Sequence, residues 1–466
     1  MIPMTLAEIA VVVGGVLDGE GAADVLVTGP ASIDSRAVPH GGLFVAVVGE
    51  RVDGHDYAGG AVEGGAAGVL GTHPCGVPAV LVADPVVALG GLARHVLDQL
   101  DGVTVLAMTG SQGKTGTKDY LAALLAPEGP TVATAGNNNN ELGVPLTVLR
   151  ADATTRYLVV EMGARGVGHI AALCEIAPPQ VAAVLNIGTA HVGEFGSREM
   201  IAVAKGEILE ALPPEGTAVL NAGDPLTSAM GVRTRATVMS FGVDAELAGV
   251  AWRDLRLDPT GRASFELGHD GHWVPVHLTQ IGVHQVENAA AAAAMALAVG
   301  VSLDDVAQRL SSVADVSRWR MEPHVRADGL LVVNDAYNAN PESMSAAVRT
   351  LAHLGRSREG RSIAVLGVMR ELGARSEEGH RRVGQVVAES GVDVLVTVGP
   401  EAAAVAEGAK ADPAWRGEAI VTASRDEALS WVRENVTAAD AVLVKASRGA
   451  ALEHIVEGIL EGTADR

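Results

Sequence analysis

The chain has 466 residues, of which 48% are hydrophobic and 19% charged, a composition typical of globular proteins that excludes a mainly disordered chain. Its formal net charge of −22 argues against nucleic-acid binding, which needs clustered Lys and Arg, but not against small anionic ligands. The two cysteines, Cys75 and Cys174, have no metal-ligand spacing, so we expect reduced thiols in the cores of a cytoplasmic protein.

The length predicts roughly three domains. The first is expected over residues 1–101, where short apolar runs alternate with many glycines, as in a small α/β domain. No basic region precedes the first apolar run, so no signal peptide is expected. The most apolar segment, 289–301, is alanine-rich and shorter than a membrane span, which predicts a buried helix and no membrane span.

From residue 102, apolar runs alternate with glycine-rich turns and amphipathic stretches. "VTVLAMTG" predicts a buried strand, "TKDYLAALLA" a helix, and "YLVVEMGA" and "VAAVLNIGTA" two more buried strands. Buried strands that alternate with helices indicate a parallel sheet covered on both faces. We therefore predict a central domain of this kind over residues 102–316.

The last 140 or so residues repeat this rhythm and predict a doubly wound, Rossmann-like domain over 317–466. Strands are expected at "LLVVNDAY", "SIAVLGVM", "VDVLVTVG", "EAIVTAS" and "DAVLVKAS". Two helix starts are signalled, by Asn340 before Pro341 and by a capping box of Ser424 with Glu427. The polar, non-periodic segment "VADVSRWRMEPH" marks the boundary before this domain.

The stretch "TGSQGKTGTK" is similar to a phosphate-binding loop between a strand and a helix, although Met108 stands where G-x-x-x-x-G-K-[ST] has its first glycine. Gly110 and Gly113 would let the backbone approach phosphates. Lys114 would neutralise the transferring phosphate, and the Thr115 hydroxyl would bind Mg²⁺. The alternative is a tight turn that contains G-K-T by chance.

Polar residues follow the predicted strands at the edge where parallel sheets bind ligands. Glu161 ends one strand and His191 follows another, and both are candidate metal ligands, although Mg²⁺ prefers oxygen. The alternatives are a strand-end cap for Glu161 and an ordinary loop residue for His191. Lys205, taken alone, is an ordinary surface lysine on a helix. The asparagine run 137–140 could be a turn rich in residues that tolerate the left-handed conformation.

Taken in order, these stretches resemble the Mur ligase family of ATP-dependent amide-bond-forming enzymes of peptidoglycan synthesis, whose ATP loop also lacks the first glycine. The resemblance covers nearly the whole chain. It is carried by "TGSQGKTGTK", "GNNNNELGVPLTVL", "EMGARGVGHI", "NIGTAHVGEFGS", "AKGEIL", "GVHQVENAAAAAA", "NDAYNANPESM", "GVMRELG" and "VLVKASRGAALE". "SIDSRAVPHGGLFVAVVGERVDGHDY" is similar to the uridine-binding domain of the two later ligases in the pathway.

The resemblance implies three domains that bind, in order, the uridine nucleotide, ATP and the incoming peptide. The ATP-binding residues it implies are Gly110, Ser111, Gln112, Gly113, Lys114, Thr115, Gly116, Asn288 at the adenine, and Arg320 and Asp335 at the phosphates and ribose after domain closure. The catalytic residues are Lys114, Glu161, His191 and Lys205. Two Mg²⁺ ions would be held by Thr115, Glu161, His191 and a Lys205 carbamate formed with CO₂. Ser35 and Arg36 would bind the uridine diphosphate, and Asn139 and Asn140 the muramoyl part.

The implied reaction is the ADP-forming ligation of D-alanyl-D-alanine to UDP-N-acetylmuramoyl-tripeptide through an acyl phosphate, by a monomer. The chain departs from the family at Val368, where Asp is usual, at Trp319, where Gly usually precedes Arg320, and more mildly at Gly116 and Ala446. One alternative is the preceding ligase, which extends the UDP-linked dipeptide, but its D-N-P-R motif does not occur here. Another is a folylpolyglutamate synthetase, which lacks the uridine domain. A third is a non-catalytic nucleotide-binding relative, which would need only the loop.

Overall fold

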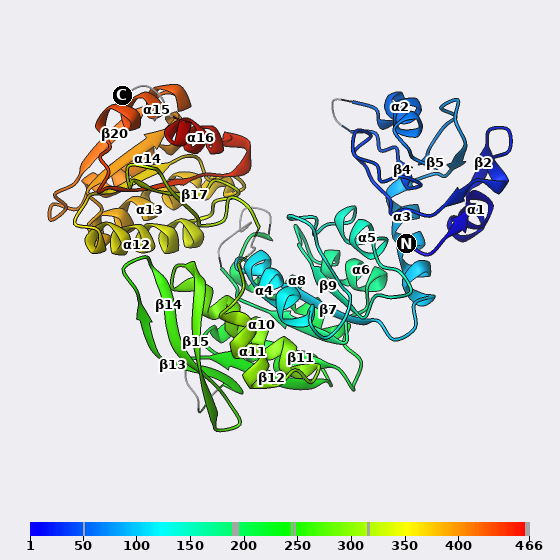
Figure 1. The fold of residues 1–466 in the computed structure, drawn as a ribbon, viewed down its shortest axis with the longest axis horizontal. Coiled ribbons are helices and arrows are strands. Elements are labelled where there is room, and N and C mark those ends of the chain that lie inside the picture. The colour runs from blue at the N-terminus through cyan, green and yellow to red at the C-terminus, as the bar shows by residue number, and fades with distance from the viewer. Residues whose placement is uncertain (50–51, 189–194, 244–245, 247, 315–316, 462–466) are drawn as a thin grey trace.

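The computed structural model describes residues 1–466 except 50–51, 189–194, 244–245, 247, 315–316 and 462–466. The chain folds around three main sheets in sequence order. The blue N-terminal part and the yellow-to-red C-terminal part lie at opposite ends of the cyan-to-green central part (Figure 1). Among the helices of the described residues, none is both long enough and apolar enough to cross a membrane.

The N-terminal part is built on a four-stranded sheet in which β5 lies between and parallel to β4 and β6, while β2 is antiparallel at the edge. Its strands are β2 (Val16–Asp18), β4 (Leu43–Val45), β5 (Gly68–Gly71) and β6 (Ala79–Leu81). A short antiparallel pair, β1 (Met4–Thr5) with β3 (Leu26–Val27), and helices α1 (Leu6–Val13) and α2 (Ala58–Glu63) complete it. The Thr5 hydroxyl and the Glu8 carboxylate form a capping box that starts α1.

Helix α3 (Pro85–Asp98) joins the first part to the second. It packs against α1 on one side and against α5 (Gly143–Val148) and α6 (His169–Ile176) of the central part on the other. Its buried Leu89 and Leu92 belong to the same apolar core as Val144. The N-terminal part is therefore anchored to the central part through a shared hydrophobic core.

The central part contains a nine-stranded sheet in the order β15-β14-β13-β12-β11-β10-β7-β9-β8 within the described residues. The parallel strands are β7 (Thr104–Thr109), β8 (Thr131–Ala133), β9 (Tyr157–Glu161), β10 (Val181–Val184), β11 (Thr217–Asn221) and β12 (Thr237–Gly242). An antiparallel meander extends this sheet through β13 (Val250–Leu257), β14 (Arg262–His269) and β15 (His272–Ile281). The predicted parallel sheet is confirmed, whereas the meander was not predicted.

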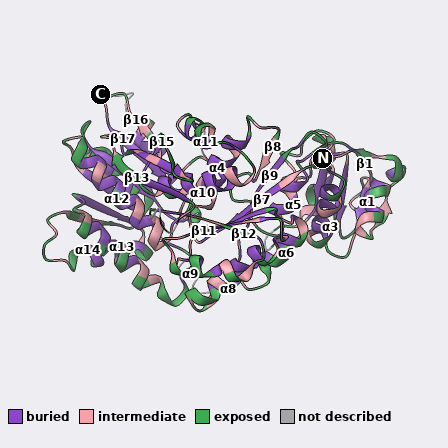
Figure 2. Cartoon of the chain, turned by 90° about the horizontal axis from the view of Figure 1, so that it is seen from below, coloured by how far each residue is buried: buried purple, intermediate pink, exposed green. Residues whose placement is uncertain are grey.

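Helices cover both faces of the central sheet, and Figure 2 shows buried residues between these layers and exposed ones outside. One face carries α4 (Lys114–Leu125), α10 (His284–Ala298) and α11 (Leu303–Leu310). The other carries α5, α6 and α8 (Arg198–Glu210), with the short α9 (Pro225–Ser228) packed beside α8. The alanine run of α10 is buried from residue 289 to 296 and packs against α4, which confirms the predicted buried helix.

The C-terminal part contains a six-stranded sheet in the order β16-β17-β21-β18-β19-β20. The five predicted strands are confirmed as β17 (Leu331–Asp335), β18 (Ser362–Leu366), β19 (Val394–Val398), β20 (Glu418–Thr422) and β21 (Ala441–Lys445). One face is covered by α12 (Pro341–Ser357), α13 (Ser376–Ser390) and α14 (Ala403–Lys410), and the other by α15 (Arg425–Asn435) and α16 (Glu453–Glu461). The antiparallel edge strand β16 (Glu322–Val325) lies in the segment that we expected to be non-periodic.

The two predicted helix starts differ in outcome. Asn340 caps α12 through a capping box with Ser343, and Pro341 occupies the first turn. Ser424 caps α15 by accepting from the Glu427 N–H, as expected. The prediction of a full capping box is wrong, however. The Glu427 carboxylate accepts from the N–H of Ala423, one residue before the cap, and not from the N–H of Ser424.

Candidate active site

The glycine-rich loop connects β7 to α4, at the carboxyl edge of the central sheet. Gly113 has φ +81° at the start of α4, and a Cβ there would lie 2.5 Å from Oδ1 of Asn288. A Cβ at Gly116 would lie 2.7 Å from Nδ2 of the same side chain. These glycines are needed because α10 presses Asn288 against the loop. Met108 is a fully buried core residue of β7, so the missing glycine lies in the strand and not in the turn.

Two lysines meet at this loop. The Nζ of Lys114 donates to the carbonyl oxygen of Gly110 at 2.8 Å, and the Nζ of Lys205 donates to the same oxygen at 3.1 Å. The interpretation of Lys205 as a surface lysine is wrong, because the residue is only 3% exposed. Burial lowers the pKa of both ammonium groups, and the charge of Lys114 lowers the pKa of Lys205 further. Glu161 acts in the opposite direction on both.

Glu161 ends β9 and is buried, and both of its carboxylate oxygens are bonded. Oε2 accepts from the Thr115 hydroxyl at 2.9 Å, and Oε1 accepts from Nδ2 of Asn139 at 2.7 Å. The Thr115 hydroxyl and the Glu161 carboxylate are oxygen donors of the kind that Mg²⁺ prefers, so this pair fits the implied metal. Lys205 offers no oxygen as an amine, and His191 lies outside the described residues.

A cavity of about 740 Å³ opens beside these residues, between the central and C-terminal parts. It is lined by most of the predicted site residues, namely Ser111, Gln112, Gly113, Lys114, Thr115, Gly116, Asn139, Asn140, Glu161, Lys205, Asn288, Arg320 and Asp335. Asn140 also accepts from the Gly143 N–H at 3.0 Å, so its side chain turns the chain into α5. The structure therefore brings residues from both parts of the chain to one cavity.

Ser35 and Arg36 do not line this cavity. Among the described residues of the N-terminal part, only Ile33 lies in its wall. The Arg36 side chain is 87% exposed and forms a two-point contact with Asp34 at 2.9 Å. The predicted role of these two residues in binding uridine diphosphate stays a prediction.

Several cavity residues were not singled out from the sequence. They are Arg165, His169, Asn186, Tyr337, Arg370, Lys445, Ser447 and Arg448. Asn186, two residues after the end of β10, accepts from the Gln112 N–H at 3.0 Å and donates to the Gln112 carbonyl oxygen at 3.1 Å, so it stabilises the loop. All eight belong to stretches quoted for the family resemblance or adjoin them, but nothing in their local pattern distinguishes them from other polar residues.

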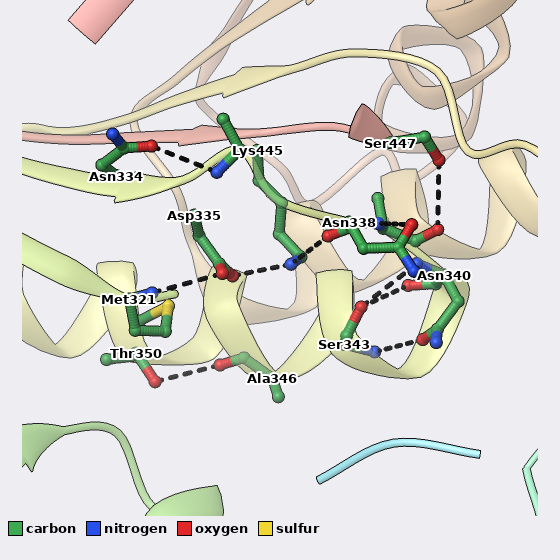
Figure 3. A network of polar contacts seen from close by, with 12 residues as sticks. Met321, Asn334, Asp335, Asn338, Asn340, Ser343, Ala346, Thr350, Lys445 and Ser447 are labelled. Carbon is green, nitrogen blue, oxygen red and sulfur yellow. Dashed lines mark hydrogen bonds and ion pairs between the residues drawn. The ribbon is translucent and has the colours of Figure 1, made fainter. Parts of the chain in front are cut away.

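Asp335 and Lys445 form a buried ion pair of 2.6 Å, which Figure 3 shows at the ends of neighbouring strands β17 and β21. The Lys445 ammonium also donates to the Asn338 carbonyl oxygen at 2.8 Å, and the Met321 N–H donates to Asp335 at 3.2 Å. The neighbouring Arg320 lies over the Tyr337 ring, 4.2 Å from its centroid. The predicted residues Arg320 and Asp335 are thus held together through Met321.

The departures from the family pattern are accommodated locally. Trp319 has φ +61°, a left-handed conformation that favours glycine, and the turn nevertheless forms. The Val368 carbonyl oxygen accepts from the Ser447 N–H at 3.0 Å, a contact that needs no polar side chain. Ala446 is fully buried, and a Cβ at Gly367 would lie 2.8 Å from its Cβ.

Among the described residues, one further cluster has the composition of a metal site: Asp53, His55 and His73. His55 uses both ring nitrogens inside the protein, since Nδ1 lies 2.6 Å from Asp53 and Nε2 accepts from the Thr72 N–H at 2.8 Å. The His73 ring stacks on it, with 3.9 Å between centroids. These contacts explain the cluster as a structural network, because His55 has no free nitrogen for a metal.

Comparison with known proteins gives matches along the chain. The family models that match are the Mur ligase family catalytic domain over residues 31–90, the Mur ligase middle domain over 108–296, and the Mur ligase glutamate ligase domain over 319–448. The UDP-N-acetylmuramoyl-tripeptide–D-alanyl-D-alanine ligase of Mycobacterium tuberculosis is 44% identical over an alignment of 503 residues, which covers 99% of this chain and 98% of the relative.

Solved structures extend the likeness to three dimensions. The crystal structure of MurF from Acinetobacter baumannii has a TM-score of 0.87 and 33% identity, and the match covers 99% of each chain. The MurF ligase of Thermotoga maritima in complex with ADP has a TM-score of 0.79 and 30% identity, over 94% of this chain and 98% of that one.

Proposed function

This chain belongs to the Mur ligase family, and we propose that it ligates D-alanyl-D-alanine to UDP-N-acetylmuramoyl-tripeptide, with conversion of ATP to ADP and phosphate. The product is the UDP-linked pentapeptide of peptidoglycan synthesis. The observation that carries the proposal is the single cavity in which the ATP loop, Glu161 and the C-terminal residues Arg320 and Asp335 meet. The Mycobacterium tuberculosis relative, whose name is that of the ligase of this reaction, and the MurF structure from Acinetobacter baumannii each match 99% of the chain.

The chemistry follows from the weakness of a carboxylate as an acyl donor. An oxygen of the tripeptide's terminal carboxylate attacks the γ-phosphorus of ATP, the bond to the β–γ bridging oxygen breaks, and ADP leaves. The amine of D-alanyl-D-alanine then attacks the acyl carbon, phosphate leaves, and the amine loses its proton. Lys114 and the backbone N–H groups of the loop are the groups that stabilise the charge on the transferring phosphoryl group.

Thr115 and Glu161 would hold Mg²⁺, with Lys205 and His191 as further ligands. Bound Mg²⁺ would neutralise charge on the phosphate oxygens. Asn139 keeps the Glu161 carboxylate oriented through the 2.7 Å bond to Oε1, so this asparagine supports the site whether or not it also touches the muramoyl group.

We propose that Lys205 acts as a carbamate. Only a neutral amine adds to CO₂. Within the described residues Lys205 forms no salt bridge, and its Nζ donates to the Gly110 carbonyl oxygen. Its burial favours the neutral form. The charge of Glu161 opposes the neutral form of Lys205 without outweighing burial. Carbamylation would replace an ammonium by an anionic oxygen group, which is the change that a metal ligand at this position requires.

Asn288 is proposed for the adenine, Arg320 and Asp335 for the phosphates and ribose, and Asn139, Asn140, Ser35 and Arg36 for the uridine-linked substrate. The position of the cavity between two parts of the chain supports exclusion of water from an acyl phosphate. Since ATP and a UDP-linked precursor are the substrates, we propose the cytoplasm as the site of action.

Phosphate release with ATP and Mg²⁺ tests the proposal when each substrate is omitted in turn. Release should require both UDP-N-acetylmuramoyl-tripeptide and D-alanyl-D-alanine. Release with the UDP-linked dipeptide and a free amino acid would instead identify the preceding ligase. Nucleotide binding without release under any combination would identify a non-catalytic relative.

A further inference from the structure

Trp319 holds a conformation that a tryptophan rarely adopts. Its φ of +61° lies in the left-handed region, where a bulky side chain is strained. Two backbone contacts fix the residue, because its N–H donates to Glu322 at 2.9 Å and its carbonyl oxygen accepts from the Tyr337 N–H at 3.2 Å. Both contacts would be available to a glycine. The indole ring must therefore have another reason to be there.

The ring of Trp319 is covered by the guanidinium group of Arg448, whose central carbon lies 4.2 Å from the ring centroid. Arg448 begins the short 3₁₀ helix Arg448–Ala450 after β21, and its Nη1 donates to the buried carboxylate of Glu453. A planar group held on one face by a ring and at one nitrogen by a carboxylate can present only its remaining edge to a ligand.

Arg448 lies in the cavity wall, and so does Arg320. Arg320 is held in the same way, over the ring of Tyr337 at 4.2 Å, and its Nε is buried without a hydrogen-bond partner in the described part of the chain. Burial raises the pKa of Tyr337, and the charges of Arg320 and Arg448 both oppose this rise.

We propose that Trp319 is a positioning residue that holds Arg448 at the cavity wall, so that Arg448 binds an anionic oxygen group of a substrate. This anionic group is a phosphate or a carboxylate, because a guanidinium group binds either of them through two parallel N–H groups. The group belongs either to the nucleotide or to one of the two peptide substrates. This inference rests on the proposed ligase function.

The experiment measures kcat and the KM of each substrate separately for Trp319→Ala, Trp319→Phe, Arg448→Met and the double variant Trp319→Ala/Arg448→Met. We expect Trp319→Ala and Arg448→Met to raise the KM of the same single substrate about tenfold, the loss of one charge-assisted contact. Trp319→Phe keeps an aromatic face and should stay within about twofold of the parent. The double variant should be no worse than Arg448→Met, because Trp319 acts through Arg448.

A matched control exists in the meander, where the guanidinium group of Arg253 lies 4.1 Å from the ring centroid of Trp273, outside the cavity wall. Trp273→Ala should leave all three KM values unchanged. Trp319→Gly removes the ring and relieves the strain of the left-handed conformation, so the melting temperature of this variant should equal or exceed that of the parent. Its KM for the affected substrate should match that of Trp319→Ala.

The substrate whose KM rises identifies the anion: ATP points to a phosphate, D-alanyl-D-alanine to its carboxylate, and the uridine-linked substrate to its own anionic groups. Unchanged KM values in Trp319→Ala, or losses that multiply in the double variant, would overturn the inference. Both outcomes can occur while the parent protein turns over its substrates normally. If the parent itself shows no turnover that depends on both peptide substrates, the proposed function is contradicted instead. If Trp319→Ala does not fold, Trp319→Gly takes its place, because it also removes the ring: a KM unchanged from the parent in Trp319→Gly would overturn the inference.

Discussion

Lys114 and Lys205 donate to one and the same acceptor, the carbonyl oxygen of Gly110. Two buried ammonium groups that share an acceptor repel each other, and the pKa of Lys205 is held well below its usual value, first by burial and then by the charge of Lys114. We propose that these two identical side chains have different roles. Lys114 would be the cation for a phosphate, and Lys205 would be the amine that can be neutral.

Substitution of Lys205 by alanine should abolish phosphate release, because the site would lose the group that we propose as an anionic metal ligand. Short carboxylic acids added to the assay should restore part of the activity by occupying the space of the lost carbamate. Lys410→Ala is the control, since Lys410 is an exposed residue at the end of α14. Full activity of Lys205→Ala would remove this lysine from the catalytic site.

Substitution of Lys114 by alanine should abolish turnover and leave the binding of the uridine-linked substrate intact. Lys114 contacts the loop carbonyl of Gly110, and a phosphoryl group in transfer needs its charge. Calorimetric titration with UDP-N-acetylmuramoyl-tripeptide measures the second part of the prediction. A simultaneous loss of turnover and of this binding would indicate misfolding and contradict a local role.

The first turns of α4 offer a matched pair of threonines for testing the metal site. Thr115 donates to Glu161, whereas the buried Thr117 hydroxyl has no partner in the described residues. Thr115→Val should raise the Mg²⁺ concentration for half-maximal turnover by about tenfold, the equivalent of one lost contact to the ion. Thr117→Val should leave it unchanged. Equal effects of the two changes would show that Thr115 acts through packing and not through the metal.

The two thiols provide a test of burial through pH. Burial raises the pKa of Cys174 to about 12, and it also raises the pKa of the half-buried Cys75. Because the thiolate is the reactive form, iodoacetamide at pH 8 should label Cys75 before Cys174, as read by mass spectrometry of peptides. Labelling of Cys174 should speed up as pH rises towards 12. Equal rates at pH 8 would contradict the buried position of Cys174.

The sequence predicted the strands and the loop because these depend on local patterns. Continuous apolar runs predicted β7, β9 and β10, and the glycine and G-K-T spacing predicted the loop and the start of α4. The segment 289–301 is rich in alanine and too short to span a membrane, which predicted that α10 is a buried helix. The fold class followed from the alternation of these elements. The meander from β13 to β15 was missed because its strands carry exposed polar residues among the apolar ones.

What local patterns could not predict are contacts between distant segments. The burial of Lys205 depends on a loop almost a hundred residues earlier, since its partner is Gly110. Likewise, the pairing of Asp335 with Lys445 depends on the register of β17 with β21. The resemblance to a family assigned roles to several of these residues, but it named Trp319 only as a departure, and the contact with Arg448 appears only in three dimensions.

Breaking the buried ion pair of Asp335 and Lys445 should strongly destabilise the C-terminal part. Lys445→Met leaves a buried carboxylate without its partner, which costs about 3–5 kcal/mol in comparable cases. The double change Asp335→Asn/Lys445→Met removes both charges and should cost less than the single one. The exposed pair of Arg381 and Glu407, 2.8 Å apart, is the control, since Arg381→Met should cost at most about 1 kcal/mol. Urea denaturation followed by tryptophan fluorescence measures these differences. If Lys445→Met costs no more than Arg381→Met, the ion pair would not be what holds Met321 and Arg320 at the cavity.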